Sequence, residues 1–119
     1  MDRVQVITSE GKSYVFVDFT RCKVSELAAV AAEANKVIAG YPKGSALVLT
    51  DVTEAELNRE SSQLFKDYTS RNTPFVRASA VIGVEGLKEI ILSSIQRIAG
   101  RNFRAFSSIP EAEHWLLAQ

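Results

Sequence analysis

The sequence is poor in the residues that build disulfides, metal sites and proton-transfer chemistry. Cys22 is the only cysteine and His114 the only histidine among 119 residues. One cysteine cannot form an intrachain disulfide or a cysteine-based zinc site, and one histidine rules out a histidine-cluster metal site. It also leaves little scope for histidine-based proton transfer. We therefore expect no metal ion, no cofactor and no catalytic residues.

Excess charge and long apolar runs are also missing. Fourteen basic and fourteen acidic residues cancel, so no net field draws nucleic acid or an anionic membrane toward the chain. No apolar run approaches the roughly 20 residues of a membrane span. The N-terminus lacks the basic and then apolar pattern of a signal peptide. We expect a cytoplasmic protein with no transmembrane segment, and we do not expect nucleic acid as its partner.

What is present suits one globular domain. The chain has 119 residues, of which 46% are hydrophobic and 24% charged, an ordinary composition for a soluble domain. A chain of this length can bury one core but not two. The sequence contains no repeat, linker or low-complexity tract, so we predict a single domain over residues 1–119.

Strand-like and helix-like patterns alternate along the chain. The β-rich segments 4–7 and 14–19 flank a turn signal at 9–12 and predict a hairpin. The apolar run 46–49, the alternating segment 76–84 and the short segment 103–106 predict three more strands. Helical spacing predicts four helices after the hairpin. The first is capped by Ser25 and ended by a left-handed Gly40, and a polar helix follows from Asn58 to Arg71. A third helix carries Leu87 to Ile98 and is ended by Gly100, and the last helix is opened by Ser108.

The resulting order is β-β-α-β-α-β-α-β-α, which predicts an α/β fold with a mixed, mainly parallel sheet. In open α/β sheets, ligands favour the crevice at the carboxyl ends of the strands. In this chain the segments 18–20, 51–53 and 83–86 are expected at that edge.

Three stretches together point to a known family. They are 47–53 (LVLTDVT), 73–88 (TPFVRASAVIGVEGLK) and 111–116 (EAEHWL). Read together they resemble the SpoIIAA-like group of bacterial proteins, placed near STAS domains and the CRAL-TRIO lipid-binding fold. The resemblance spans nearly the whole chain and implies a small STAS-like domain that acts through binding.

One functional feature of STAS anti-sigma-factor antagonists is missing. These proteins carry a phosphorylated serine in an Asp-Ser-Ser-Gly turn before a helix. Here Ser61 and Ser62 lie within the expected polar helix and are flanked by Glu60 and Gln63. The phosphorylation switch is therefore not assigned to any residue of this chain.

The residues expected at the strand ends allow more than one interpretation. Asp51 could accept a phosphoryl group, hold Mg²⁺ or bind a ligand hydroxyl, or Asp51 and Thr53 could bond the N–H groups of the loop and helix. The turn from Gly83 to Gly86 precedes a helix, where N–H groups attract anions, but tight-turn geometry also explains its glycines. Arg59 opposes a cluster of acidic residues at the entry to the polar helix.

The leading functional hypothesis is a non-enzymatic regulatory or protein-interaction module. Its partner would dock at a rim formed by the segment 51–53, the polar helix and the turn 83–86, with Asp51, Thr53, Arg59, Gly83 and Gly86 as the binding residues. The alternative is a small-molecule binder for a lipid-like or nucleotide ligand, that is, an apolar or an anionic one. An enzyme would need Asp18 and Asp51 as a neighbouring carboxylate pair.

Self-association is expected for a different reason. If the helices cover mainly one face of the sheet, apolar surface remains on the other face, and pairing of two copies into a homodimer would bury it.

Overall fold

The structure, a computed structural model, describes residues 2–56, 58–85, 93, 97 and 103–119. Five strands lie in one sheet in chain order, which confirms the α/β fold. They are β1 (Val4–Ser9), β2 (Lys12–Asp18), β3 (Ala46–Asp51), β4 (Val76–Ile82) and β5 (Phe103–Phe106). β1 pairs antiparallel with β2, and each later strand runs parallel to its neighbour. The predicted helix between β4 and β5 lies outside the described residues, except for Ser93 and Arg97.

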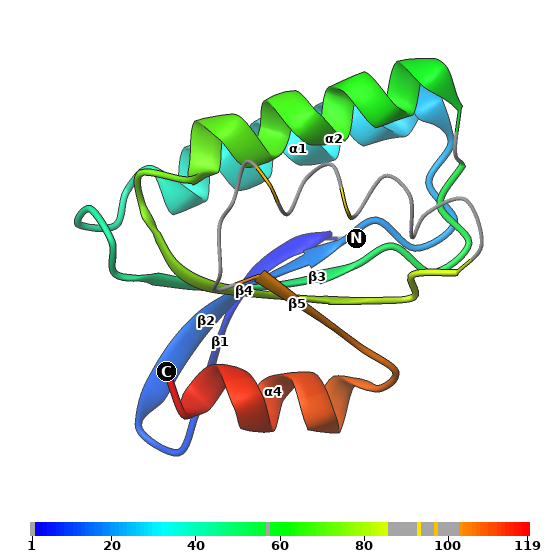
Figure 1. The fold of residues 1–119 in the computed structure, drawn as a ribbon. Helices are drawn as coiled ribbons and strands as arrows, with labels where there is room; N and C mark the ends of the chain where they lie inside the picture. Colours follow the sequence, from blue (N-terminus) through cyan, green and yellow to red (C-terminus); the bar gives the residue numbers. More distant parts are fainter. Residues whose placement is uncertain (1, 57, 86–92, 94–96, 98–102) are drawn as a thin grey trace.

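Helices lie on both faces of the sheet (Figure 1). Helices α1 (Val24–Ile38) and α2 (Arg59–Asn72) cover one face, and α4 (Ile109–Leu117) crosses the other. On the α4 face, Ala112 and Leu116 pack with Leu47 and Leu49, and all four are buried. The premise of an uncovered apolar face was therefore wrong, because the last helix folds back onto the side opposite α1 and α2.

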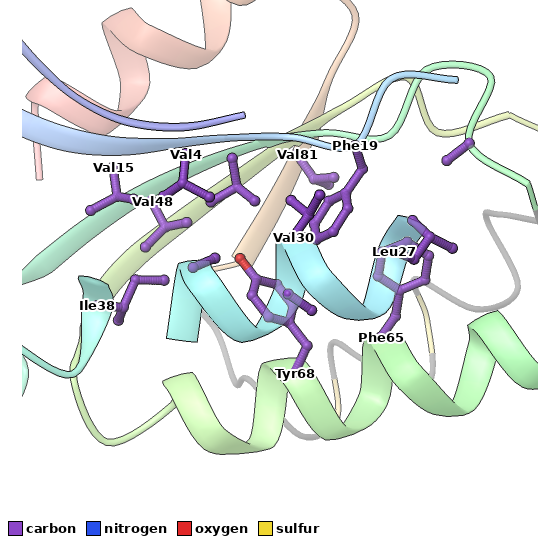
Figure 2. Packing of buried hydrophobic residues seen from close by; sticks show 14 of the residues in the cluster. Val4, Val15, Phe19, Leu27, Val30, Ile38, Val48, Phe65, Tyr68 and Val81 are labelled. Atoms are coloured by element: carbon purple, nitrogen blue, oxygen red, sulfur yellow. The ribbon is translucent and has the colours of Figure 1, made fainter. Parts of the chain in front are cut away.

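The larger core lies between the sheet and the pair α1 and α2 (Figure 2). Phe19 is fully buried at its centre, and its ring meets those of Phe65 and Tyr68 edge to face, with centroids 5.2 and 5.6 Å apart. Burying an aromatic or branched apolar side chain contributes about 1.5–3 kcal/mol. Leu27 and Ile38 of α1 pack in the same cluster and are fully buried.

Two local predictions hold because the residues involved are close in sequence. Glu10 and Gly11 both have positive φ, +52° and +80°, as a two-residue hairpin turn requires. Ser108 caps α4 by accepting a hydrogen bond from the Glu111 N–H at 3.4 Å, with proline in the first turn.

Two predictions at the ends of α1 were wrong. The helix begins at Val24, ahead of Ser25, because Glu26 accepts from the Lys23 N–H and Glu56 accepts from the Val24 N–H, each at 3.1 Å. The helix then ends in a tight turn in which the Gly40 N–H bonds the Val37 carbonyl at 3.1 Å, so Gly40 does not take the left-handed conformation.

Candidate functional site

The carboxyl ends of β2 and β3 carry the same turn, spelled Asp-X-Thr in both. Asp18 Oδ1 accepts hydrogen bonds from the N–H and the hydroxyl of Thr20, at 2.8 and 2.5 Å. Asp51 Oδ1 accepts from the N–H and the hydroxyl of Thr53, at 2.9 and 2.6 Å. Such bonds stabilise a turn because a carboxylate oxygen satisfies an N–H that would otherwise lack a partner.

The two turns lie side by side. Asp18 and Asp51 are partners in the sheet register, and the pairing continues beyond the strands. The Phe19 N–H donates to the Asp51 carbonyl at 2.9 Å, and the Arg21 N–H donates to the Thr53 carbonyl at 3.0 Å. We call the paired segments 18–21 and 51–54 the twin turns.

The residue after each threonine takes the left-handed conformation, with φ of +55° at Arg21 and +56° at Glu54. Their side chains form an ion pair with Nε and Oε2 3.2 Å apart. Both side chains are exposed, so the pair contributes about 0–1 kcal/mol. The pair joins the outer ends of the twin turns.

The twin turns give Asp51 a structural role, in line with the interpretation that it bonds N–H groups of its own loop. Asp51 is 8% exposed, and its Oδ1 is engaged by Thr53. Asp18 is the neighbour that a carboxylate pair would need, but it holds its own turn and lies 3.7 Å from the Arg3 guanidinium. Both carboxylates therefore serve the backbone of their own loops.

Gly83 belongs to the same edge and is fitted against Thr53. Its φ is +84°, and a Cβ at this position would lie 2.5 Å from the Thr53 nitrogen and 2.7 Å from its Cα. The Val52 N–H bonds the Ile82 carbonyl at 2.9 Å and fixes this approach. Of the predicted site residues, Asp51, Thr53 and Gly83 are thus brought together. Arg59 is exposed at the first residue of α2, and Gly86 lies outside the described residues.

Cys22 follows the first twin turn and is fully buried. Burial raises the pKa of its thiol, Glu26 and Asp18 add to the rise, and Arg3 opposes it. Basic neighbours can lower a thiol pKa, but the side chains of Arg21 and Lys23 are exposed while the thiol is buried. Cys22 is therefore a small buried core residue.

The sequence did not predict a groove between α1 and α2. The groove is open to solvent and has a volume of about 390 Å³. Helix α1 lines the groove with three small residues and one amide, namely Ala28, Ala31, Ala32 and Asn35. Helix α2 lines it mainly with polar side chains, namely Glu60, Gln63, Leu64, Asp67, Tyr68 and Arg71. At one end Asn35 Nδ2 donates to the Tyr68 carbonyl at 3.2 Å and to Asn72 Oδ1. The sequence does contain a hint of the groove. Ala28, Ala31 and Ala32 occur on successive turns of α1, and their small side chains leave space between this helix and α2.

In the described part of the chain, no helix combines the length and apolar character needed to span a bilayer. Within the same residues, no three His, Cys, Asp or Glu side chains are grouped so that they could hold a metal ion.

The comparisons with known proteins identify the fold. No protein-family model and no curated protein sequence matches this chain. Among solved structures, the chain is similar to an uncharacterized protein of the DUF3478 family from Shewanella loihica PV-4, which has a SpoIIAA-like fold. The TM-score is 0.73 at 16% sequence identity, over 95% of this chain and 91% of that one. The fold of this chain is thus SpoIIAA-like, as its sequence resemblance implied.

Proposed function

We propose that this chain is a non-enzymatic protein-interaction module that regulates a partner by binding it in the groove between α1 and α2. The observation that carries the proposal is the groove itself. Its lining combines the apolar side chains of Ala28, Ala32 and Leu64 with the charged side chains of Glu60 and Asp67. Protein interfaces usually combine apolar contacts with polar ones in this way.

The partner segment is best described as an amphipathic helix. A helix packs closely where the receiving surface presents small residues, and it presents apolar side chains at every third or fourth position. Basic residues beside that apolar stripe would pair with Glu60 and Asp67. The exposed side chains of Thr53 and Arg59 would extend the contact toward the edge of the sheet.

Two further features support binding over catalysis. The two carboxylates that an enzyme would need at the sheet edge, Asp18 and Asp51, are engaged in the twin turns. Helix α2 buries few residues, namely Ser61, Phe65, Tyr68 and Asn72, so most of its surface is left for a partner. The proposed setting is the cytosol, where the lone thiol of Cys22 stays reduced.

A small ligand is the second candidate. A volume of about 390 Å³ lies within the 300–1,000 Å³ range of small-molecule sites. The apolar part of the lining suits a lipid-like ligand, and Arg71 at the groove suits an anionic one such as a nucleotide.

A matched pair of substitutions tests the groove. Ala32 and Ala29 are both exposed residues of α1, but only Ala32 lines the groove. Ala32→Trp fills the groove, and Ala29→Trp places the same ring outside it. We expect a protein recovered by wild type in pull-downs to be recovered equally by Ala29→Trp and at least about tenfold less by Ala32→Trp, a loss of about 1.4 kcal/mol.

Equal recovery by the two variants would contradict the groove as the binding site. Native mass spectrometry of the purified chain separates the two candidates. A co-purifying mass of a few hundred daltons that Ala32→Trp loses would support the small-molecule function in place of a protein partner.

A further inference from the structure

We propose that β1 is the interface through which two copies of this chain pair into a symmetric dimer with one continuous sheet. This surface lies at the edge of the sheet, and no residue of β1 lines the groove between α1 and α2, so the inference is independent of the proposed function. It also replaces the reason first given for a homodimer, since α4 covers the face that was expected to be bare.

The outer edge of β1 carries unused backbone groups. β1 is the terminal strand of the sheet. The Asp18 N–H donates to the Arg3 carbonyl at 2.7 Å, so the backbone groups of Arg3 point toward β2. Because antiparallel strands alternate between bonded and non-bonded pairs, the N–H and C=O groups of Val4, Val6 and Thr8 point away from β2.

Nothing within β1 protects that edge. Natural edge strands are blunted by charge, proline, bulges or short length. β1 reads VQVITS, without a charged residue or proline, and pairs with β2 over six residues without a register shift. Val6 is 55% exposed, one of the two exposed large hydrophobic residues of the described chain.

The opposite edge of the sheet is protected. β5 has only four residues, Phe103–Phe106. It carries the exposed Arg104, whose guanidinium lies 5.9 Å from the Phe106 ring centre and 5.8 Å from that of Trp115. The two edges therefore differ in the features that prevent edge pairing, and the contrast singles out β1.

A second copy of the chain fits this edge. A two-fold axis at Val6 places Val6 opposite the second copy's Val6, and Val4 opposite the second copy's Thr8. Each of these residues presents its outward N–H and C=O, so each opposed pair exchanges two hydrogen bonds. The side chains of all three lie on the α1 face, because residues two apart share a face. Because the formal net charge is zero, two copies do not repel each other through their net charge.

Matched charge substitutions test the dimer in solution. Val6→Lys places two ammonium groups opposite each other across the two-fold axis. Ile109→Lys alters the other exposed hydrophobic residue, at 40% exposure on α4. By light scattering coupled to size exclusion, we expect wild type and Ile109→Lys to shift from monomer to dimer mass with concentration, and Val6→Lys to stay monomeric.

Monomeric wild type at concentrations on the order of 1 mM would overturn the proposal, since even about 4 kcal/mol of association would be visible there. So would a Val6→Lys variant that dimerises like wild type. Circular dichroism checks that Val6→Lys is folded, which we expect because the side chain is already more than half exposed.

Cysteine cross-linking tests the register. Opposed Val6 residues have Cα atoms about 5.5 Å apart, within the range of a disulfide. The two Thr8 residues of the dimer would not face each other, because they are offset by four positions, about 13 Å along the strands. We expect Val6→Cys to form a covalent dimer under mild oxidation and Thr8→Cys not to do so, while the buried Cys22 stays unreacted. Equal cross-linking of both variants would contradict the Val6-centred pairing.

Discussion

At Gly83 the absence of a side chain is a structural requirement. The residue combines a left-handed φ of +84° with a close approach to the backbone of Thr53. Either feature alone favours glycine, since left-handed backbone costs other residues about 1–2 kcal/mol. The approach adds a steric cost, because a backbone neighbour cannot rotate away as a flexible side chain can. The edge of the sheet therefore depends on this position.

We predict that Gly83→Ala lowers the free energy of unfolding by about 2–5 kcal/mol, the sum of the conformational cost and a packing cost of about 1–3 kcal/mol. Gly44→Ala is the control. Its φ is +70°, but a Cβ there meets nothing within 4 Å, so only about 1–2 kcal/mol should be lost. Urea unfolding followed by Trp115 fluorescence measures both. Equal losses would show that the approach to Thr53 carries no cost.

The twin turns show the limit of sequence reading at the residue scale. The Asp-X-Thr pattern at 18–20 and 51–53 is visible in the sequence, and side-chain to backbone bonding is one of the interpretations given above for Asp51 and Thr53. That the two turns pair with each other depends on the register of β2 and β3, which joins Asp18 to Asp51 across 33 positions. No local pattern contains that register.

Helix α4 depends on its contacts with the rest of the molecule. It has nine residues, too few for a stable isolated helix. Glu113 attaches it to the hairpin by accepting from the Tyr14 hydroxyl at 2.5 Å and from the Ser9 hydroxyl at 3.3 Å. Burial, the hydrogen bond to Glu113 and the charge of Glu113 all raise the pKa of Tyr14. The phenol therefore stays protonated and keeps donating.

We predict measurable coupling between Tyr14 and Glu113. In a double-mutant cycle with Tyr14→Phe and Glu113→Gln, the coupling in the free energy of unfolding should be about 1–2 kcal/mol, because the acceptor is charged and the pair is half-buried. Glu111→Gln in place of Glu113→Gln gives the control cycle, since Glu111 bonds Ser107 and Ser108 and not Tyr14. Additive effects in the first cycle would contradict this account of how α4 is held.

Prediction from sequence worked for elements whose signals are local. The cap at Ser108 and the hairpin turn at Glu10 each involve residues no more than three apart. The cap expected at Ser25 failed because Glu56, which accepts from the Val24 N–H, is 32 residues away. The groove was missed for the same physical reason, since it arises from the relative placement of two helices.

For the molecule as a whole, a buried phenol links stability to pH. Burial raises the pKa of Tyr68 to about 12, and the Thr50 and Asn72 side chains only partly offset this rise. Among the described residues, the hydroxyl has no hydrogen-bond partner of regular geometry. Because the folded pKa lies above the unfolded value of about 10, the contribution to stability is complete below pH 10. It is lost as pH rises toward 12.

We predict that wild type loses stability more steeply than Tyr68→Phe between pH 10 and 12, by up to about 1.4 kcal/mol per pH unit. At pH 7 the variant should lie within about 1 kcal/mol of wild type, because replacing an unpartnered hydroxyl removes no hydrogen bond. Urea unfolding across this pH range measures both quantities. Parallel pH profiles for the two proteins would contradict the assignment.

The sequential strand order has a consequence for biosynthesis. Every strand pairs with the one made just before it, so a chain emerging from the ribosome can add each strand to a sheet already begun. Helix α4 reaches back to the first hairpin, through bonds from Ser9 to Glu113 and from Lys12 to Leu117 that span 104 and 105 positions. Growth of the sheet can thus keep pace with translation, while the final closure waits until α4 has been made.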